Sequence, residues 1–126
     1  MKQLRFFGIN YLVPDGFEFL DKEIDNYPSF CGAGSGIGDK VVPETIGGMR
    51  CSHICHAHDE SWESAPATFN GFTVSNALFG FNLTVYLASG NGNWFKKGWR
   101  MFKGGLYVTA VSTIGWGIFK SMKGIG

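Results

Sequence analysis

The residues with the clearest chemical capacity lie between positions 30 and 62. The first group is a glycine-rich stretch, Phe30-Cys31-Gly32-Ala33-Gly34-Ser35-Gly36-Ile37-Gly38. The second is a segment dense in sulfur, nitrogen and carboxylate groups, Cys51-Ser52-His53-Ile54-Cys55-His56-Ala57-His58-Asp59. Glycine at every second position allows a backbone to curl closely around a bound group. Such a loop, followed by histidines and a carboxylate, suggests a site that binds a metal, catalyses a reaction, or does both.

One interpretation is a calcium-dependent hydrolase. Calcium prefers carboxylate and backbone carbonyl oxygens, and Asp59 together with the glycine-rich loop supplies both kinds of ligand. His58 precedes Asp59 and would act as general base for a water held beside the cation. Backbone N–H groups of the loop would help to stabilise an oxyanion.

Two other interpretations stay open at this point. Zinc is usually held by Cys and His, and five such residues lie close together: Cys51, His53, Cys55, His56 and His58. Their spacing matches no known zinc finger, and on a helix His53 and His56 point away from the face that the others share. The third interpretation treats them as core residues of a helix, which leaves the glycine-rich loop unexplained.

The elements that would position these residues are mainly helical. Between Met49 and about Trp62, apolar residues, Cys and His recur on one face at helical spacing, which predicts a helix. Pro66 lies just past its expected end. Further helices are expected from Thr73 to about Ala88 and from Trp94 to about Met122, separated by the break at 89–93.

The N-terminal part predicts a small hairpin. Residues 4–20 alternate loosely between apolar and polar side chains, and Pro14-Asp15-Gly16 interrupts them. This triplet is a turn signal, because Pro presets the first turn dihedral and Gly adopts the left-handed one. Residues 27–38 are expected to form a loop, and residues 41–48 a connection or the first turn of the following helix.

Composition and charge exclude several classes of protein. A chain of 126 residues suggests one domain, and its 16% aromatic content excludes a disordered chain. The net charge of +1 excludes a nucleic-acid binder that is driven by charge. Residues 1–63 carry five basic and ten acidic residues, whereas residues 64–126 carry six basic residues and no acidic one. The second half would attract an anionic surface such as lipid phosphate, unless the fold mixes the two halves.

An aromatic stripe runs through the last predicted helix. It comprises Trp94, Phe95, Trp99, Phe102 and Leu106, with Lys96, Lys97, Arg100 and Lys103 between them. We expect most of these apolar residues to pack in the core. The alternative is docking at a lipid surface, with Trp and Phe in the headgroup zone and Lys or Arg on phosphate.

The N-terminus shows no secretory signal peptide, and no segment is long enough to span a membrane. The longest uncharged run, Gly104 to Phe119, has 16 residues, whereas a span needs about 20 apolar ones. Three cysteines are too few for a disulfide-stapled scaffold. We therefore expect a soluble protein that can touch membranes; its location is left open, with export by a non-classical route and delivery on a virion as the alternatives.

Two motifs resemble the secreted phospholipase A2 superfamily. Phe30-Cys31-Gly32-Ala33-Gly34 is similar to its calcium loop, and Cys55-His56-Ala57-His58-Asp59 to its Cys-x-x-His-Asp helix. More narrowly, the chain resembles the small phospholipase A2-like proteins of bacteria and phages. The weaker matches are Val42-Pro43-Glu44-Thr45, Ser75-Asn76-Ala77-Leu78-Phe79-Gly80-Phe81-Asn82 and Tyr107-Val108-Thr109-Ala110-Val111. The resemblance covers roughly residues 28–115.

The resemblance implies a mainly α fold with a calcium loop and three helices. The single domain, 1–126, would comprise a hairpin segment (1–26), the calcium loop and His-Asp helix (28–62) and two further helices (73–122). The implied function is calcium-dependent hydrolysis of the sn-2 acyl ester of phospholipids at a membrane surface.

The resemblance also implies roles for individual residues. His58 would take the proton from the attacking water, and the N–H of Gly32 would donate to the oxyanion. The implied calcium ligands are the carboxylate of Asp59 and the backbone carbonyls of Phe30, Gly32 and Gly34. Cys31 and Cys55 match a pair that is disulfide-bonded in the family, which leaves Cys51 as the odd thiol.

Two residues depart from the family pattern. The family usually has Tyr where Trp62 stands, and it usually has Asp at the position of Asn76, where the side chain orients the catalytic histidine. Asn accepts a hydrogen bond from the imidazole but does not stabilise the imidazolium, and its amide can flip. In the serine-protease triad the analogous change slows turnover about 10⁴-fold. We therefore expect low activity; the alternative is a weak or inactive phospholipase-like protein that binds lipid or a structural metal, calcium or zinc.

Overall fold

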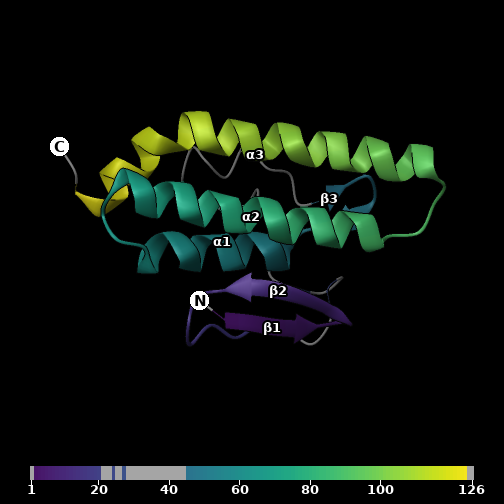
Figure 1. Ribbon diagram of the computed structural model, residues 1–126, viewed down its shortest axis with the longest axis horizontal. Helices are drawn as coiled ribbons and strands as arrows, with labels where there is room; N and C mark the ends of the chain where they lie inside the picture. The colour runs from purple at the N-terminus through teal and green to yellow at the C-terminus, as the bar shows by residue number, and fades with distance from the viewer. Residues whose placement is uncertain (1, 21–23, 25–26, 28–44, 125–126) are drawn as a thin grey trace.

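The computed structural model describes residues 2–20, 24, 27 and 45–124. Its elements are, in chain order, β1 (Lys2–Phe6), β2 (Ile9–Val13), β3 (Thr45–Ile46), β4 (Met49–Arg50), α1 (Ser52–Ser64), α2 (Phe69–Ser89) and α3 (Trp94–Lys123). α2 contacts both α1 and α3, and the β1–β2 hairpin lies on the side of the helices opposite to α3 (Figure 1). The prediction of a mainly helical fold with a small N-terminal hairpin is confirmed.

The hairpin turn lies elsewhere than the sequence suggested. β1 and β2 pair antiparallel from Lys2↔Val13 to Phe6↔Ile9, so the turn is Phe7-Gly8. Both residues have positive φ, 52° and 78°, which matches the twist of the flanking strands in a two-residue turn. The expected Pro14-Asp15-Gly16 turn does form, with the Phe17 N–H donating to the Pro14 carbonyl at 3.1 Å, but it leads out of β2.

A second hairpin occupies the expected start of the first helix. Thr45 pairs with Arg50 and Ile46 with Met49, around a turn in which Gly47 and Gly48 have φ of 57° and 83°. The prediction that the helix begins at Met49 is therefore wrong. The two glycines form a hairpin turn, and the residues on either side of it, Met49 included, adopt the extended conformation of paired strands. α1 begins at Ser52 instead.

Of the other two helices, α2 begins earlier than predicted and α3 begins where predicted. α2 begins at Phe69, four residues early, because the Thr68 hydroxyl accepts a hydrogen bond from the Gly71 N–H at 3.0 Å. α3 begins as predicted at Trp94, where the Asn93 side chain accepts from the Lys96 N–H at 2.9 Å. None of these described helices has both the length and the hydropathy that a membrane span requires.

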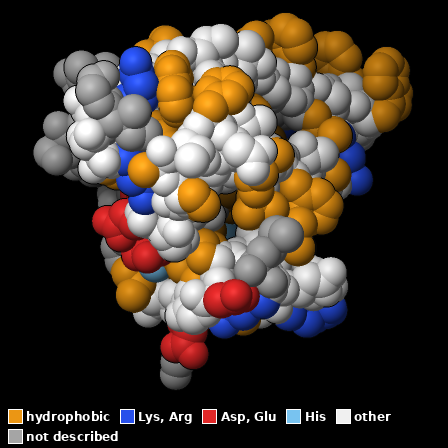
Figure 2. Space-filling model, turned by 60° about the vertical axis from the view of Figure 1, so that its left-hand side comes forward, with side chains coloured by type: hydrophobic (Ala, Val, Ile, Leu, Met, Phe, Trp, Pro, Cys, Tyr) orange, Lys and Arg blue, Asp and Glu red, His pale blue; other side chains and the backbone are white. Residues whose placement is uncertain are grey.

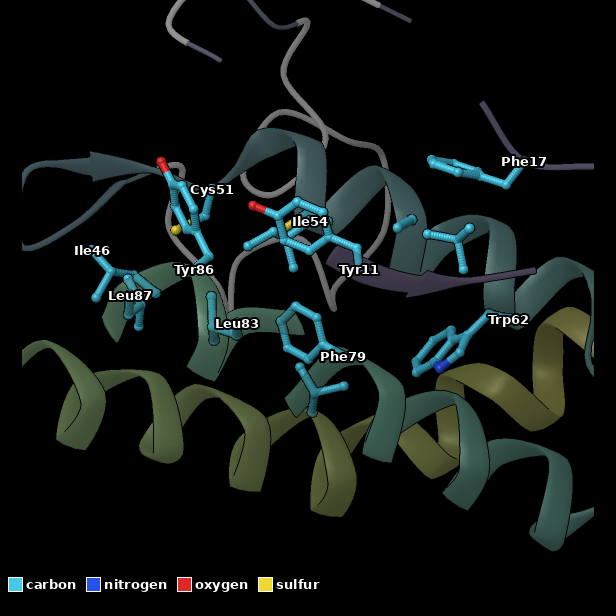
Figure 3. Packing of buried hydrophobic residues seen from close by; sticks show 14 of the residues in the cluster. Tyr11, Phe17, Ile46, Cys51, Ile54, Trp62, Phe79, Leu83, Tyr86 and Leu87 are labelled. Atoms are coloured by element: carbon cyan, nitrogen blue, oxygen red, sulfur yellow. The ribbon is translucent and has the colours of Figure 1, made fainter. Parts of the chain in front are cut away.

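The core lies between the three helices and the N-terminal hairpin. Tyr11, Ile54, Phe79 and Leu83 meet there from β2, α1 and α2 (Figure 3). α3 approaches α2 closely at Gly104, where an added Cβ would lie 2.8 Å from a methyl group of Leu87. The face of α3 that contains Gly104 is therefore the face that packs on α2.

The aromatic stripe of α3 does not enter this core. Trp94, Phe95, Trp99, Phe102 and Leu106 are all exposed. The expectation of core packing is wrong because helical spacing shows which residues share a face but not whether another element covers that face. On α3 the covered face is the one with Arg100, Gly104 and Val111.

Asn82 of α2 attaches the N-terminal hairpin to the helices. Its Oδ1 accepts a hydrogen bond from the Leu12 N–H at 2.8 Å, and its Nδ2 donates to the Leu12 carbonyl at 2.8 Å. The side-chain amide therefore satisfies the outward-facing backbone groups of β2 as a neighbouring strand would.

We expect Asn82→Ala to lower the free energy of unfolding by about 2–3 kcal/mol, because both backbone groups of Leu12 would lose their partner. Chemical denaturation would measure the change. Asn70→Ala, at an exposed position of the same helix, is the control and should change stability by less than about 0.5 kcal/mol. Equal effects of the two substitutions would contradict the role given to Asn82.

Candidate active site

His58, Trp62 and Asn76 meet between α1 and α2. His58 and Trp62 lie one turn apart on α1 and both face Asn76 of α2. The Oδ1 atom of Asn76 lies 2.8 Å from Nε2 of His58 and 3.1 Å from Nε1 of Trp62. The three residues that the sequence analysis assigned to the base and its support are therefore in one hydrogen-bonded group.

Trp62 determines which atoms of this group donate and which accept hydrogen bonds. An indole Nε1 can only donate, so the Asn76 atom that it contacts is the acceptor oxygen. Nε2 of His58 must then donate to the same oxygen. The imidazole consequently carries its proton on Nε2, and Nδ1 keeps a lone pair. Nδ1 is the atom that can accept a proton from water, and no described residue forms a hydrogen bond with it.

The surroundings keep His58 neutral. The ring packs between Trp62 and Phe79, with centroids 4.8 and 4.5 Å away. Desolvation lowers the pKa of His58 to about 4, and the hydrogen bond with Asn76 opposes this shift. His58 is therefore a neutral base near pH 7, although the imidazolium that forms after proton transfer would be poorly stabilised.

Trp62 is held from behind by α2 and α3. Its ring contacts Phe72 and Phe119, with centroids 5.8 and 5.6 Å away (Trp62 is seen in Figure 3). Gly115 of α3 leaves room for the indole, since an added Cβ would lie 3.0 Å from it. The packing fixes the direction of the indole N–H, and through it the orientation of the Asn76 amide.

The structure describes only part of the predicted calcium site. Asp59 is exposed on α1 directly after His58, and its carboxylate is the hard oxygen donor that suits calcium. Phe30, Gly32 and Gly34 lie outside the described residues, so the carbonyl ligands and the oxyanion donor stay predictions.

The predicted Cys31–Cys55 disulfide also stays a prediction, because Cys31 lies outside the described residues. Cys55 is buried on α1. Cys51 is buried directly before α1, and its thiol donates to the Met49 carbonyl at 3.4 Å.

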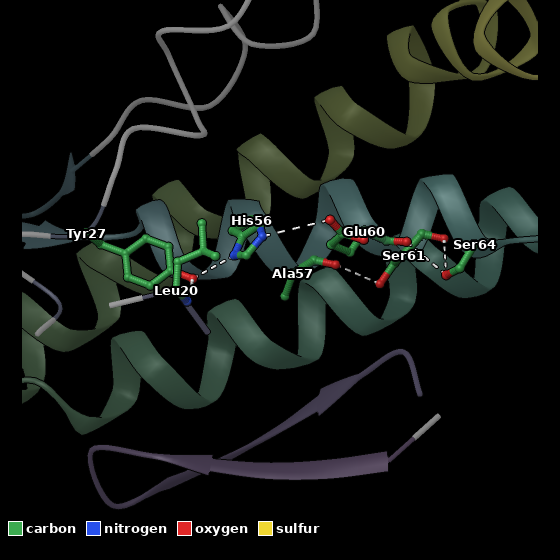
Figure 4. A network of polar contacts seen from close by, with 7 residues as sticks. All are labelled: Leu20, Tyr27, His56, Ala57, Glu60, Ser61 and Ser64. Carbon is green, nitrogen blue, oxygen red and sulfur yellow. Dashed lines mark hydrogen bonds and ion pairs between the residues drawn. The ribbon is translucent and has the colours of Figure 1, made fainter. Parts of the chain in front are cut away.

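The histidines do not gather into the zinc site considered above. His53 Nε2 is hydrogen-bonded to the Tyr11 hydroxyl at 3.1 Å, and His56 Nδ1 is hydrogen-bonded to the Tyr27 hydroxyl at 2.6 Å (Figure 4 shows the latter). His58 faces Asn76 instead. Within the described part of the chain, no three His, Cys, Asp or Glu side chains are placed to hold a metal ion.

His53 is part of an aromatic cluster that no pattern in the sequence indicates. Its ring lies 5.5 Å from that of Tyr11 and 4.7 Å from that of Tyr86, and its Nδ1 has no partner among the described residues. Tyr11 and Tyr86 lie far apart in the sequence, so no local spacing could predict that both contact His53. Burial lowers the pKa of His53 to about 3.

Comparisons with known proteins add no relative. No family model matches the chain, and neither a curated protein nor a solved structure matches it significantly. The assignment of a function therefore rests on the residues and their geometry.

We expect His53 to make the fold sensitive to acid. Its pKa is about 3 in the folded protein and near 6.5 in the unfolded chain, so the unfolded chain binds more protons between these values. Stability should fall as the pH decreases below 6.5 toward 3, by about 1.4 kcal/mol per pH unit for this one proton.

Denaturation of the wild type and of His53→Gln from pH 7 to pH 4 would test this. The carboxylates titrate in both proteins, so the difference in slope isolates His53, and the variant should show the shallower dependence on pH. Parallel curves would show that His53 does not contribute.

Proposed function

We propose that the protein is a calcium-dependent hydrolase of phospholipid acyl esters, of the phospholipase A2 type, with His58 as the general base. The observation that carries this proposal is the shared oxygen of Asn76, which accepts from both Trp62 and His58. It leaves the lone pair of the imidazole on Nδ1, which forms no hydrogen bond with a described residue. A neutral imidazole in this tautomer is what water activation requires.

The reaction would begin with a water hydrogen-bonded to Nδ1 of His58. The imidazole takes the water proton as the oxygen attacks the ester carbonyl, and the imidazolium later returns a proton to the leaving alcohol. Calcium, when bound at Asp59, would stabilise the negative charge on the carbonyl oxygen. The N–H of Gly32 would donate to that oxygen, as the resemblance implies.

The same geometry argues for slow turnover. The partner of the imidazolium is a neutral amide, so no negative charge offsets the positive charge that forms on His58. The pKa of about 4 shows how strongly the site disfavours the charged ring. A protein with this site but without useful turnover, binding lipid or metal, is the second candidate function, and this neutral partner is the observation that favours it.

His58→Gln should abolish fatty-acid release from mixed phospholipid vesicles and leave calcium binding nearly intact, because Gln cannot act as the base. Asp59→Asn should abolish both, because it removes the carboxylate ligand. Glu60→Gln, the matched control on the next residue of α1, should change neither. Fatty-acid titration and calorimetry are the measurements, with chelator and strontium as further controls.

Unchanged calcium affinity in Asp59→Asn would contradict the metal assignment. A wild type that binds calcium but releases no fatty acid would favour the second candidate function.

Asn76→Asp should raise turnover at least tenfold, and by less than the ~10⁴-fold of the triad, because a carboxylate stabilises the imidazolium. It should also raise the pKa of His58 well above 4, which titration by NMR would show. The Nδ2 atom that is replaced has no hydrogen-bond partner among the described residues. Asn70→Asp adds the same charge at an exposed position of α2 and should change neither quantity.

Trp62→Phe tests the orientation of the amide. In the wild-type background it should lower turnover, because Asn76 is then free to flip and to present its NH₂ group to His58. In the Asn76→Asp background the loss of turnover should be several times smaller, since a carboxylate presents an oxygen to His58 in both of its orientations. Equal losses in the two backgrounds would mean that Trp62 acts through packing alone.

A further inference from the structure

Four apolar side chains form a continuous exposed line on the first half of α3. Phe95, Trp99, Phe102 and Leu106 follow the spacing i, i+4, i+7 and i+11, and they are 65%, 52%, 58% and 53% exposed. We call these four residues the α3 stripe. Arg100 and Gly104, which are buried, lie on the opposite side of the helix, so the stripe points away from α2.

The charged residues that α3 itself places beside the stripe are all basic. Lys96 and Lys103 lie on the helix along one edge of it, and the ammonium of Lys103 lies 5.4 Å from the centre of the Trp99 ring. From residue 64 to residue 126 the sequence contains no acidic residue. Figure 2 shows hydrophobic side chains gathered over the upper part of the molecule, where α3 lies, whereas acidic side chains lie lower on the face shown.

We propose that the α3 stripe docks the protein on anionic lipid membranes. A helix with a line of Trp, Phe and Leu beside lysines can lie in the membrane interface, with the rings among the headgroups and the ammonium groups on lipid phosphate. The stripe is about 17 Å long at 1.5 Å per residue, which suits a helix lying on the surface. Beyond Leu106 the same face continues with the hydroxyls of Thr109 and Thr113, so the apolar surface ends there.

The charges favour lipid over a second copy of the chain. Two stripes packed against each other would bring Lys96 and Lys103 of both copies together with no acidic residue of the same helices to offset them. Anionic headgroups instead supply the opposite charge at the edge of an apolar layer.

The docking surface is separate from the candidate active site. Trp62 packs on Phe119, and Trp99 lies 20 residues before Phe119 on the same helix, which is roughly 30 Å at 1.5 Å per residue. Docking through the stripe therefore needs neither calcium nor His58, and this inference does not rest on the proposed hydrolysis.

Vesicle sedimentation with the His58→Gln protein in the presence of chelator tests the proposal without lipid turnover. Vesicles of phosphatidylcholine alone are compared with vesicles of equal parts phosphatidylcholine and phosphatidylglycerol, at low and high salt. We expect clear binding to the anionic vesicles only, weakened by salt. Adding Trp99→Ala and Phe102→Ala together should reduce binding about tenfold or more, since two half-exposed aromatic rings would no longer enter the interface.

Two further variants separate charge from apolar contact. Lys96→Gln with Lys103→Gln should weaken binding to anionic vesicles and reduce its dependence on salt. Ile114→Ala, added to the His58→Gln protein, is the matched control, because Ile114 is 55% exposed on α3 but lies outside the stripe. This protein should bind anionic vesicles as strongly as His58→Gln alone.

Three results would overturn the proposal. The first is no binding to anionic vesicles. The second is a loss of vesicle binding in Ile114→Ala that equals the loss in Trp99→Ala with Phe102→Ala. The third is a dimer in light scattering that Trp99→Ala with Phe102→Ala converts to a monomer, which would make a second copy the occupant. Failure of fatty-acid release in the wild type would leave the docking result unaffected.

Discussion

The site depends on one carbonyl oxygen that accepts two hydrogen bonds. Oδ1 of Asn76 receives the indole N–H of Trp62 at 3.1 Å and the imidazole N–H of His58 at 2.8 Å. Because the indole can only donate, the amide is held with its oxygen toward α1, and the protonation of His58 follows. Everything that fixes Trp62 therefore also fixes the orientation of the Asn76 amide and the tautomer of His58: the rings of Phe72 and Phe119, and the absence of a side chain at Gly115.

The arrangement secures the tautomer of His58 but supplies no charge. A carboxylate at position 76 would do both, and it would need no indole to hold it in one orientation. With an amide, the indole becomes necessary to the tautomer, so Trp62 and Asn76 belong together physically. Burial of His58 beside Phe79 then lowers the pKa of the ring, which keeps the imidazole neutral and makes its protonated form costly.

The sequence predicts the helices and the members of the His58 group because both depend on spacing within a segment. His58 and Trp62 are one helical turn apart, and α3 begins where Asn93 provides a cap. The sequence points to the wrong hairpin turn because Phe7-Gly8 carries a weaker local signal than Pro14-Asp15-Gly16. It does not indicate the aromatic cluster around His53, because the members of that cluster come from distant segments. Such contacts are set by tertiary packing, which no local pattern records.

α3 shows how one helix can serve two surfaces. Its buried line continues from Arg100 and Gly104 through Val111 and Gly115 to Phe119, and this line is what packs on α2 and supports Trp62. The side chains on the opposite line are not constrained by that packing, so their apolar character before Thr109 is not required by the fold. Exposed Trp and Phe have a cost in solubility and contribute little to the described core. The position of these rings beside unopposed lysines is therefore best explained by contact with a surface outside the protein. A membrane offers both an apolar layer and negative charge.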